Sequence, residues 1–395
     1  MANKFVLVIN SGSSSLKFAV IDTISGDAVL SGLGECFGLE DSRVSWKYQG
    51  EKNEVAITDE GNHHQAAIIM LVDLVKELGL TENIVSVGHR VVHGGETFTQ
   101  SVLLNEQTIK DIEAIQDLAP LHNPANLLGI RAALEAFPSL PQVAVFDTAF
   151  HQTMPPKAFT GGIARELYDM YSIRRYGFHG TSHFYVSREA AKILNKPVDE
   201  ANFISVHLGN GASVCAIKNG MSVDTSMGFT PLSGLMMGTR SGDLDPGVIE
   251  FLLKKGWTQA QVFDTLNNKS GFLGVSGLTS DARGILDAME NGHEGARLAF
   301  EIFTYRVAKY ISSYMVSLDA LDAIIFTGGI GENSLPIRSE ILSYLNLLGF
   351  KEDRAGNEAA RFGASGIITQ GEGHVAMVIP TNEELVIAQD AIALL

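Results

Sequence analysis

The sequence has little of several features that mark particular classes of protein. It has only two cysteines, Cys36 and Cys215, which argues against a disulfide framework and for a reducing compartment. Its longest apolar runs, such as residues 66–72, stop well short of the roughly 18 residues that cross a bilayer. The first residues lead straight into a short strand without the apolar core of a signal peptide. We therefore expect a cytoplasmic protein that does not enter a membrane.

Clusters of positive charge are also missing. Acidic residues outnumber basic ones by 45 to 29, and the net charge is −16. No basic run is longer than a pair such as Lys254 and Lys255, so nucleic acid would be repelled over most of the surface. An anionic substrate would need a local positive site, which makes single arginines inside apolar or glycine-rich segments informative.

The sequence does have length, glycine and regularly alternating apolar segments. A chain of 395 residues is too long to fold around one hydrophobic core, so two domains are expected. The 40 glycines suit an α/β protein with many tight turns. Strand-like runs alternate with segments of helical periodicity, which predicts α/β layers. We expect strands at 5–9, 16–21, 84–87, 143–146, 203–206, 213–217 and 323–326, and helices at 65–78, 105–119, 126–137, 181–194, 246–255, 295–318 and 383–395.

One local pattern occurs twice, half a chain apart. Residues 5–22 and 203–220 each read as an apolar strand, a turn of small residues and a second apolar strand. Turns of glycine and serine expose consecutive backbone N–H groups, which suits them to bind phosphate oxygens. Most such turns only connect strands, but two of them predict a duplicated domain with a nucleotide between the copies. The preferred boundary lies at 151–157, where two prolines follow a strand.

Arginine, aspartate and histidine occur at positions where strands or turns could present them to a ligand. Arg90 lies in a valine-rich strand beside glycines, where a guanidinium could bind a carboxylate or phosphate through two hydrogen bonds; a solvent-facing arginine is the alternative. Asp147 follows a strand end, where it could be functional or could cap the next turn. His179 lies between glycine turns, where it could donate to an anion. His89 and His93 would lie about 13 Å apart in a strand, so no zinc site is predicted.

The longest polar stretch, at 224–247, is too long for an idle loop, and Arg240 within it is a second candidate anion clamp. Residues 279–283 and 324–333 complete the set. The latter reads as a buried strand that opens into bare glycine backbone, against which a nucleoside could lie. It resembles a dinucleotide-binding fingerprint only loosely, and a plain strand–turn–helix connection is the alternative.

Taken together, these segments resemble the acetate kinase family over essentially the whole chain. Residues 10–17, 88–95, 236–243 and 328–333 carry the resemblance, in order and in spacing. It implies an α/β fold shared with sugar kinases, actin and heat-shock chaperone ATPases, in which two duplicated ribonuclease-H-like domains enclose a nucleotide cleft. We expect an acetate and phosphate domain at 1–150, completed by a helix at 384–395, and a nucleotide-binding and dimerisation domain at 151–383.

The resemblance also implies a role for individual residues. Catalysis would involve Asp147, His179 and Arg240. Acetate would be bound by Arg90 in a small acyl pocket of Val92, Leu121, Phe178 and Pro231. The nucleotide would contact Lys17, His207, Leu208, Gly209, Asn210, Gly211, Asp281, Ala282, Arg283, Gly329, Ile330, Gly331, Glu332 and Asn333. Asn10 and Glu383 would position Mg²⁺, with Mn²⁺ as the alternative.

Two of these positions carry further expectations. Relatives can have an aromatic residue beside the adenine where this chain has Ala282, so stacking from that position is lost. Acetate is already ionised at neutral pH, so the nucleophile needs no general base. Asp147 is therefore expected to organise the metal's water or Arg240 rather than to accept a proton.

The expected activity is the reversible, ATP-dependent phosphorylation of acetate to acetyl phosphate by direct in-line transfer, with ATP and ADP as co-substrates and a homodimer as the assembly. A propionate kinase or broader short-chain acyl kinase stays open, because one methylene group changes discrimination by only ~1–3 kcal/mol. A nucleotide-driven switch of the actin or chaperone type is the alternative outside the enzymes. Such a switch would not need two arginines and an apolar acyl pocket.

Overall fold

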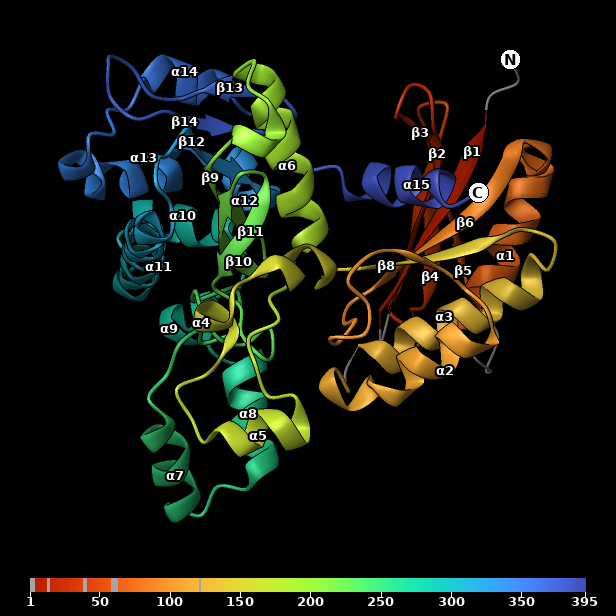
Figure 1. The fold of residues 1–395 in the computed structure, drawn as a ribbon, viewed down its shortest axis with the longest axis horizontal. Helices are drawn as coiled ribbons and strands as arrows, with labels where there is room; N and C mark the ends of the chain where they lie inside the picture. The colour runs from red at the N-terminus through yellow and green to blue at the C-terminus, as the bar shows by residue number, and fades with distance from the viewer. Residues whose placement is uncertain (1–3, 13–14, 38–40, 58–62, 121) are drawn as a thin grey trace. The chain divides into compact units, whose positions relative to one another are not determined.

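A computed structural model describes residues 4–12, 15–37, 41–57, 63–120 and 122–395. The chain forms two compact units, one of Met1–Ala149 with Asn382–Leu395 and the other of Phe150–Thr381. The C-terminal segment thus returns to the N-terminal unit, as Figure 1 shows by the blue helix α15 (Glu383–Ala393) beside the red strands. The roles expected for the two parts of the chain remain predictions.

The first unit is a mixed sheet with helices on both faces. Its sheet has the order β5-β4-β3-β2-β1-β6-β8-β7, in which β1, β6 and β8 run parallel and the other pairs are antiparallel. The strands are β1 (Phe5–Ser11), β2 (Leu16–Asp22), β3 (Ala28–Glu35), β4 (Arg43–Tyr48), β5 (Glu51–Ala56), β6 (Ile84–Val91), β7 (Val102–Leu103) and β8 (Gln142–Phe146), and the other helices are α1 (His63–Glu77), α2 (Glu106–Ala114) and α3 (Asn123–Ala136).

Strand β1 is buried on both faces because its residues alternate between two cores. Phe5, Leu7 and Ile9 pack in the core that includes residues of α1 and α3. Val6 and Val8 pack in the core formed with α15. The near-continuous apolar run of β1 follows from this double burial, and the sheet needs the C-terminal helix to cover its second face.

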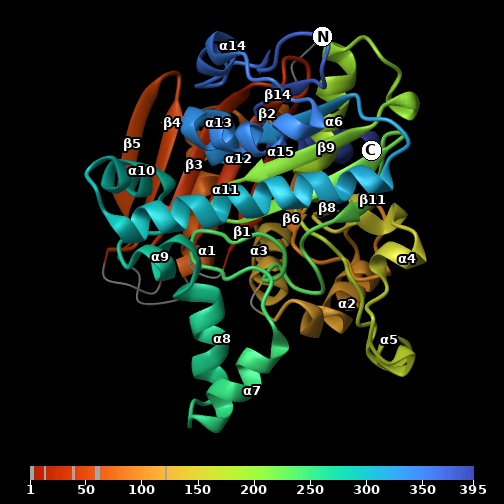
Figure 2. The same ribbon diagram turned by 90° about the vertical axis from the view of Figure 1, so that its left-hand side faces the viewer.

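The second unit contains a sheet of order β11-β10-β9-β12-β14-β13, with β9, β12 and β14 parallel. Helix α6 packs on one face through a core of small and apolar residues, and the long helix α11 contacts β9 and β10 (Figure 2). The strands are β9 (Phe203–Leu208), β10 (Ala212–Lys218), β11 (Met221–Thr225), β12 (Ala323–Thr327), β13 (Gly366–Ile367) and β14 (Ala376–Val378). The helices are α4 (Pro156–Phe159), α5 (Arg165–Tyr171), α6 (Gly180–Ile193), α7 (Pro246–Lys254), α8 (Gln259–Asn268), α9 (Gly271–Ser276), α10 (Ala282–Glu290), α11 (Glu294–Tyr314), α12 (Gly328–Asn333), α13 (Leu335–Tyr344) and α14 (Arg354–Ala359).

The two sheets share one five-stranded topology. In the first unit it is β3-β2-β1-β6-β8 and in the second it is β11-β10-β9-β12-β14, each with three antiparallel strands followed by two that run parallel to the third. This agreement confirms the duplication that the repeated strand–turn–strand pattern predicted. The units are two copies of the ribonuclease-H-like domain.

The glycine-rich segment after β12 forms the short helix α12, Gly328–Asn333. The polar stretch 224–247 begins within β11 and ends within α7, and residues 226–245 between them form the long irregular loop that the sequence predicts. Within the described part of the chain, no helix is both long and apolar enough to span a membrane.

Gly88 in β6 tests whether α15 completes the first unit. A Cβ at this position would lie 2.5 Å from Cγ2 of Ile387 on α15, so Gly88→Ala should displace the helix. We expect this variant to lower the free energy of unfolding of the first unit by about 1–3 kcal/mol. Denaturant unfolding followed by circular dichroism measures the loss. Gly162→Ala, where a Cβ would meet nothing within 4 Å, is the control.

Combining Gly88→Ala with Ile387→Ala removes the atom that clashes. The two costs should then sum to more than the cost of the double variant. Strict additivity would show that α15 does not press on Gly88.

Candidate active site

In the first unit, three polar side chains lie where parallel strands end. Asn10 is near the end of β1, Arg90 near the end of β6, and Asp147 directly follows β8. The parallel pairing brings Ile9 opposite His89 and Arg90 opposite Val145, so the three residues reach one edge of the sheet. The carboxyl edge of parallel strands is where open α/β sheets bind ligands.

Arg90 and Asp147 form a two-pronged ion pair at this edge. Arg90 Nη2 lies 2.6 Å from Asp147 Oδ2, and Nε lies 2.9 Å from Oδ1. The remaining terminal nitrogen, Nη1, donates to Asn10 Oδ1 at 3.4 Å. Burial by itself lowers the pKa of Arg90, but the charge and hydrogen bonds of Asp147 outweigh it and raise the pKa. Asp147 is thereby held as an acceptor toward Arg90 within the first unit.

A second group of charges lies beside this pair. Glu383 and Glu384 begin α15, and Lys17, opposite Asn10 in the β1–β2 ladder, is bonded to Glu384. Burial raises the pKa of Glu383 to about 7; Arg90 opposes the rise, and Asp147 and Glu384 add to it. Asn10, Lys17, Arg90 and both glutamates line a cavity of about 20 Å³.

This group offers the donors that Mg²⁺ prefers. The ion takes oxygen ligands, commonly one or two carboxylates with waters and substrate phosphates. Glu383 supplies a carboxylate and Asn10 an amide oxygen. Burial first, and then the nearby Asp147 and Glu384, raise the pKa of Glu383, and a cation would stabilise its charged form. The residues therefore fit the expected metal, although the described residues contain no cluster of three or more His, Cys, Asp or Glu side chains that could hold one.

The remaining predictions for the first unit divide between described and undescribed residues. Val92 is buried, and its N–H donates to Asn126 Oδ1 at 3.0 Å. Leu121, expected in the acyl pocket, lies outside the described residues, as do Ser13 and Ser14 of the first phosphate turn. Gly12 N–H donates to Ser15 O at 2.8 Å, which closes that turn.

His89 and His93 flank Arg90 but serve the fold. His89 Nε2 lies 2.7 Å from Gln142 Oε1, and His93 Nδ1 accepts from the N–H of Gly95. Burial lowers the pKa of both rings to about 4. Each ring therefore stays neutral in the folded protein near pH 7.

The two neutral rings predict a pH dependence of stability. An unfolded histidine binds a proton near pH 6.5, and the folded rings do so only near pH 4. Between these values only the unfolded state gains the proton, so the free energy of unfolding falls on acidification, by about 1.4 kcal/mol per pH unit for each ring. In His89→Met, the free energy of unfolding should change less steeply with pH, by the contribution of one ring. Denaturant titrations between pH 6.5 and 4.5 measure this dependence. His374→Met, at an exposed position, is the control.

In the second unit, the turn between β9 and β10 packs against the long irregular loop at 226–245. The N–H of Gly209 donates to Gly211 O at 2.9 Å, which leaves Asn210 at the tip. Gly238 N–H donates to Asn210 O, and a Cβ at Gly238 would lie 1.8 Å from Asn210 Oδ1. A larger residue at 238 would displace the Asn210 side chain, so glycine lets the loop and the turn pack together as one surface.

Arg240 is held by the backbone of this loop and the start of α9. The segment turns tightly because Met237 N–H donates to Arg240 O at 3.0 Å. The first residues of α9 then donate to its carbonyl groups: Phe272 N–H to Met237 O at 2.9 Å and Leu273 N–H to Gly238 O at 3.0 Å. These bonds fix the position from which the Arg240 side chain extends.

Arg240 is half-buried and has no carboxylate partner among the described residues. Its Nη1 donates to Pro231 O at 3.4 Å and lies 3.9 Å from Met237 Sδ. Burial lowers the pKa of Arg240. A guanidinium deprived of water and of a counter-charge favours the arrival of an anion.

His179 faces the same place as Arg240. A Cβ built on Gly211 would lie 3.4 Å from His179 Nε2 and 3.6 Å from Arg240 Nη1, so both side chains border this glycine. His179 has a left-handed backbone, with φ 57°, and its ring stacks on His207 at 4.2 Å. A bulky residue in this conformation is strained, and such strain is often found at functional sites.

Buried serines connect His179 to a second histidine. Ser213 Oγ lies 2.9 Å from His179 Nδ1 and 2.8 Å from His183 Nε2, and His183 Nδ1 lies 2.8 Å from Ser205 Oγ. Burial lowers the pKa of His183 well below its usual value, and His151 and His207 add to the effect. Ser213 has one hydroxyl proton, so when it donates to a neutral His179, His179 carries its own proton on Nε2, beside Gly211.

The acyl-pocket residues expected in this unit have backbone roles in the network. Pro231 O accepts from Arg240, and Phe178 O accepts from His151 Nε2 at 2.9 Å. The ring of Phe178 is buried. Phe178 is therefore the chain neighbour of His179, and Pro231 is hydrogen-bonded to Arg240.

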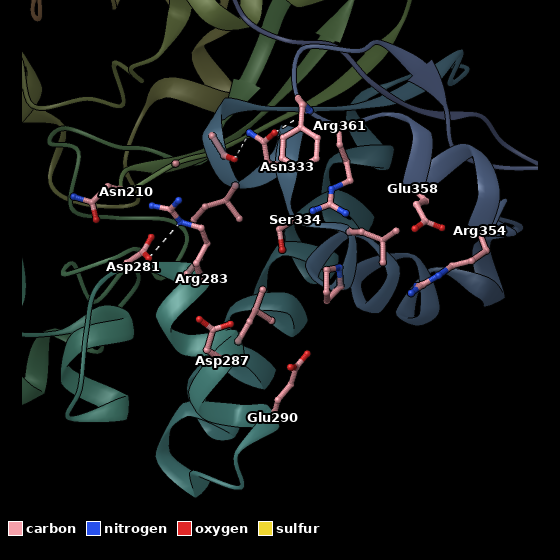
Figure 3. Close-up of a pocket in the computed structure, with 18 residues that line it drawn as sticks. Asn210, Asp281, Arg283, Asp287, Glu290, Asn333, Ser334, Arg354, Glu358 and Arg361 are labelled. Atoms are coloured by element: carbon pink, nitrogen blue, oxygen red, sulfur yellow. Dashed lines mark hydrogen bonds and ion pairs between the residues drawn. The ribbon is translucent and has the colours of Figure 1, made fainter. Parts of the chain in front are cut away.

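A pocket of about 860 Å³ opens between α10, α12, α13 and α14 (Figure 3). Eight of the residues predicted to contact the nucleotide line it: Gly209, Asn210, Asp281, Ala282, Arg283, Gly329, Ile330 and Asn333. Asp281 caps α10 by accepting from Gly284 N–H, and it pairs with Arg283 at 3.5 Å. A Cβ at Gly329 would meet nothing within 4 Å, so the pocket wall there is bare backbone.

The other predicted nucleotide residues of this unit do not line the pocket. Leu208 and Gly331 are buried, and His207 Nδ1 lies 2.8 Å from Ser182 Oγ. Glu332 Oε1 accepts from the N–H groups of Gly328 at 2.9 Å and Thr381 at 3.0 Å, which ties α12 to the segment after β14. Gly211 borders Arg240 and His179 instead.

Several lining residues were not foreseen from the sequence. They come from α13, α14 and the turn after α14, and include Glu358, Arg361 and Phe362. No glycine motif or strand end marks these positions, and only the packing of α14 against α13 brings them to the pocket. Ser213 and His183 likewise gain their place from contacts distant in sequence.

The two duplicated sheets define a protein of the actin-like ATPase fold. The profile of the acetokinase family matches residues 5–389. The chain belongs to the acetokinase family.

Relatives and solved structures agree over the full length. The chain is 74% identical to acetate kinase 2 of Aliivibrio fischeri and 72% identical to acetate kinase 2 of Vibrio cholerae, with each chain covered completely. A propionate kinase structure from Francisella tularensis matches with a TM-score of 0.95 and 46% identity, covering 99% of this chain and all of the other. The acetate kinase structure from Porphyromonas gingivalis matches with a TM-score of 0.92 and 42% identity, covering 99% of both chains.

Proposed function

We propose that this protein transfers the γ-phosphoryl group of ATP to acetate, reversibly, to give acetyl phosphate and ADP. The observation that carries the proposal is Arg240, a half-buried guanidinium with no described carboxylate partner, bordering the same glycine as His179. The relatives named acetate kinase support the choice of acetate as acceptor.

The chemistry asks for positioning and charge stabilisation. A carboxylate oxygen forms a bond to the γ-phosphorus while the bond from phosphorus to the β–γ bridging oxygen breaks, and ADP leaves with that electron pair. No proton is transferred, because acetate is already ionised. Catalysis then depends on holding two anions in line and on stabilising the charge of the transferring group.

Each candidate side chain has a role that suits its surroundings. Arg240 stabilises the transferring phosphoryl oxygens, and His179 donates to them from Nε2. Arg90 binds the acetate carboxylate with the N–H groups that Asp147 leaves unused. Asp147 orients Arg90 and does not act as a base, since its oxygens accept three hydrogen bonds from that guanidinium.

The nucleotide is assigned to the second unit. Its phosphates would meet the N–H groups of the 209–211 turn, and its nucleoside would enter the pocket lined by α10 and α12. Asn10 and Glu383 would hold Mg²⁺. When bound, this ion neutralises phosphate charge and fixes the orientation of the phosphate chain.

We also infer a homodimer. Helices α7 and α8 project from the second unit (Figures 1 and 2). Large apolar side chains are exposed on these helices and on the segment that joins them. Phe251 is 58% exposed and Trp257 and Phe263 are each 40% exposed, which suits a surface that a second copy would cover.

The activity can be tested directly. Purified protein with ATP, Mg²⁺ and acetate should form an acyl phosphate that hydroxylamine traps as the hydroxamate. The kcat/KM for acetate should exceed that for propionate, and the reverse order would support the alternative acceptor. Absence of any hydroxamate, with ATP still bound, would indicate a nucleotide switch instead of a kinase.

Arg240→Lys tests whether the guanidinium of Arg240 stabilises the transition state of phosphoryl transfer. Lysine keeps the charge but loses the planar pair of donors. We expect kcat to fall by about 10²–10³ with little change in the KM for ATP, because the interaction strengthens in the transition state. Arg297→Lys, at an exposed position of α11, is the matched control. A folded Arg240→Lys protein with normal kcat would place the catalytic arginine elsewhere.

Arg90→Lys tests the acetate site without stranding Asp147. Removing the whole side chain would leave a buried carboxylate unpaired at a cost of about 3–5 kcal/mol. With lysine, kcat/KM for acetate should fall by about 10- to 150-fold, the loss of a charged hydrogen bond. ADP affinity, measured by calorimetry, should be unchanged. An equal loss for acetate and ADP would mean that Arg90 only supports the fold.

A further inference from the structure

The nucleoside pocket has no aromatic residue on the wall formed by α10. Ala282 opens that helix, and its small side chain is only 5% exposed. Nucleobases commonly gain affinity by stacking on an aromatic ring. The sequence therefore predicts lost stacking at this position, and the question is whether another wall of the pocket supplies it.

Phe362 lines the opposite part of the same pocket and lies in an unusual turn. Ala364 N–H donates to Arg361 O at 3.1 Å, and the two central residues have φ values of 55° at Phe362 and 90° at Gly363. Positive φ at both positions is the pattern of a type I′ turn, in which glycine, asparagine and aspartate predominate. A phenylalanine at the first central position is therefore strained.

Packing does not account for this phenylalanine. Phe362 is 82% exposed, so its ring is not part of a core. The guanidinium carbon of Arg361 lies 4.7 Å from the centre of the ring, which holds one side by a cation–π contact. A strained and exposed aromatic residue in a pocket points to a role in ligand binding.

Asn333 fixes the turn to the bare wall of the pocket. Its Oδ1 accepts from Phe362 N–H at 3.1 Å, and its Nδ2 donates to Gly329 O at 3.0 Å. Figure 3 shows Asn333 and Arg361 at this end of the pocket, across from Asp287 and Glu290 of α10. The open space over Gly329 is thus next to the turn that carries Phe362.

We propose that Phe362 is the aromatic platform for the nucleobase, in place of the residue missing at Ala282. A base that lies over the bare backbone of Gly329 is contacted by the face of the Phe362 ring. The inference rests on the proposed function for the presence of a nucleotide, and it adds which residue determines affinity for the base. Stacking tolerates any base, so Phe362 contributes affinity more than choice among purines.

The test uses three substitutions at one position. Phe362→Asn removes the ring but suits the left-handed backbone, so the turn should survive and the unfolding midpoint should hold or rise. The KM for ATP and the dissociation constant of ADP should increase by about 5- to 100-fold, with kcat and the KM for acetate little changed. Phe362→Trp should keep or improve affinity, and Phe362→Leu should fall between the two. Leu347→Asn, at a residue 96% exposed elsewhere in this unit, is the control for loss of a surface apolar side chain.

Inorganic tripolyphosphate separates base binding from phosphate binding. It has no base, so its inhibition constant should be equal in the wild type and in Phe362→Asn, and ATP and GTP should lose similar factors. An unchanged ADP dissociation constant in Phe362→Asn would overturn the proposal for Phe362. The proposed kinase function is tested separately, by whether the wild-type protein makes acetyl phosphate. A loss of tripolyphosphate binding in Phe362→Asn would also overturn it, because the turn would then be supporting the phosphate site.

Discussion

The charge on Arg240 is the constraint on which the second unit depends. A guanidinium removed from water needs a partner, and no described carboxylate provides one, so the fold must keep it in place by other means. Backbone hydrogen bonds from α9 to the Met237–Gly238 segment do this, and Gly238 allows the loop to close on Asn210. The absence of a side chain at Gly238 therefore matters first for packing, whether or not a phosphate is bound. It lets two chain segments approach closely enough to present a cation and backbone donors together.

The two arginines that the sequence singled out prove to be electrostatically different. Arg90 is neutralised by Asp147, which raises its pKa and fixes the plane of its guanidinium. Arg240 has no carboxylate partner among the described residues, and burial lowers its pKa. An anion would gain more free energy from a cation without a carboxylate partner than from one that is already paired. This contrast matches the proposed roles, in which Arg90 orients the acetate carboxylate and Arg240 stabilises the charge of the transferring phosphoryl group.

Much of the fold was predictable because its strong signals are local. The apolar run of β1, the glycine turn and the return strand β2 are readable in one window, and their repetition in β9 and β10 revealed the duplication. The strands that were not foreseen are β3, β4, β5, β7, β11, β13 and β14. They are short or mix polar with apolar residues, so pairing with a neighbouring strand decides their conformation more than their own sequence does. In the site, arginines beside glycine were found from the sequence. Phe362 was not, since a surface phenylalanine acquires meaning only when the turn and its link to Asn333 are known.

The position of the acidic residues shows how a site can depend on packing far from it in sequence. Glu383 and Glu384 begin α15, and α15 lies on the sheet because Gly88 leaves room for Ile387. Arg90 is two residues beyond Gly88 on the same strand, so the glycine that admits the helix also sets the distance between its carboxylates and the guanidinium. The raised pKa of Glu383 follows from that burial and from the company of Asp147 and Glu384. The proposed site for a cation therefore depends on the packing of α15 on the sheet, which makes the completed first unit a precondition for the proposed chemistry.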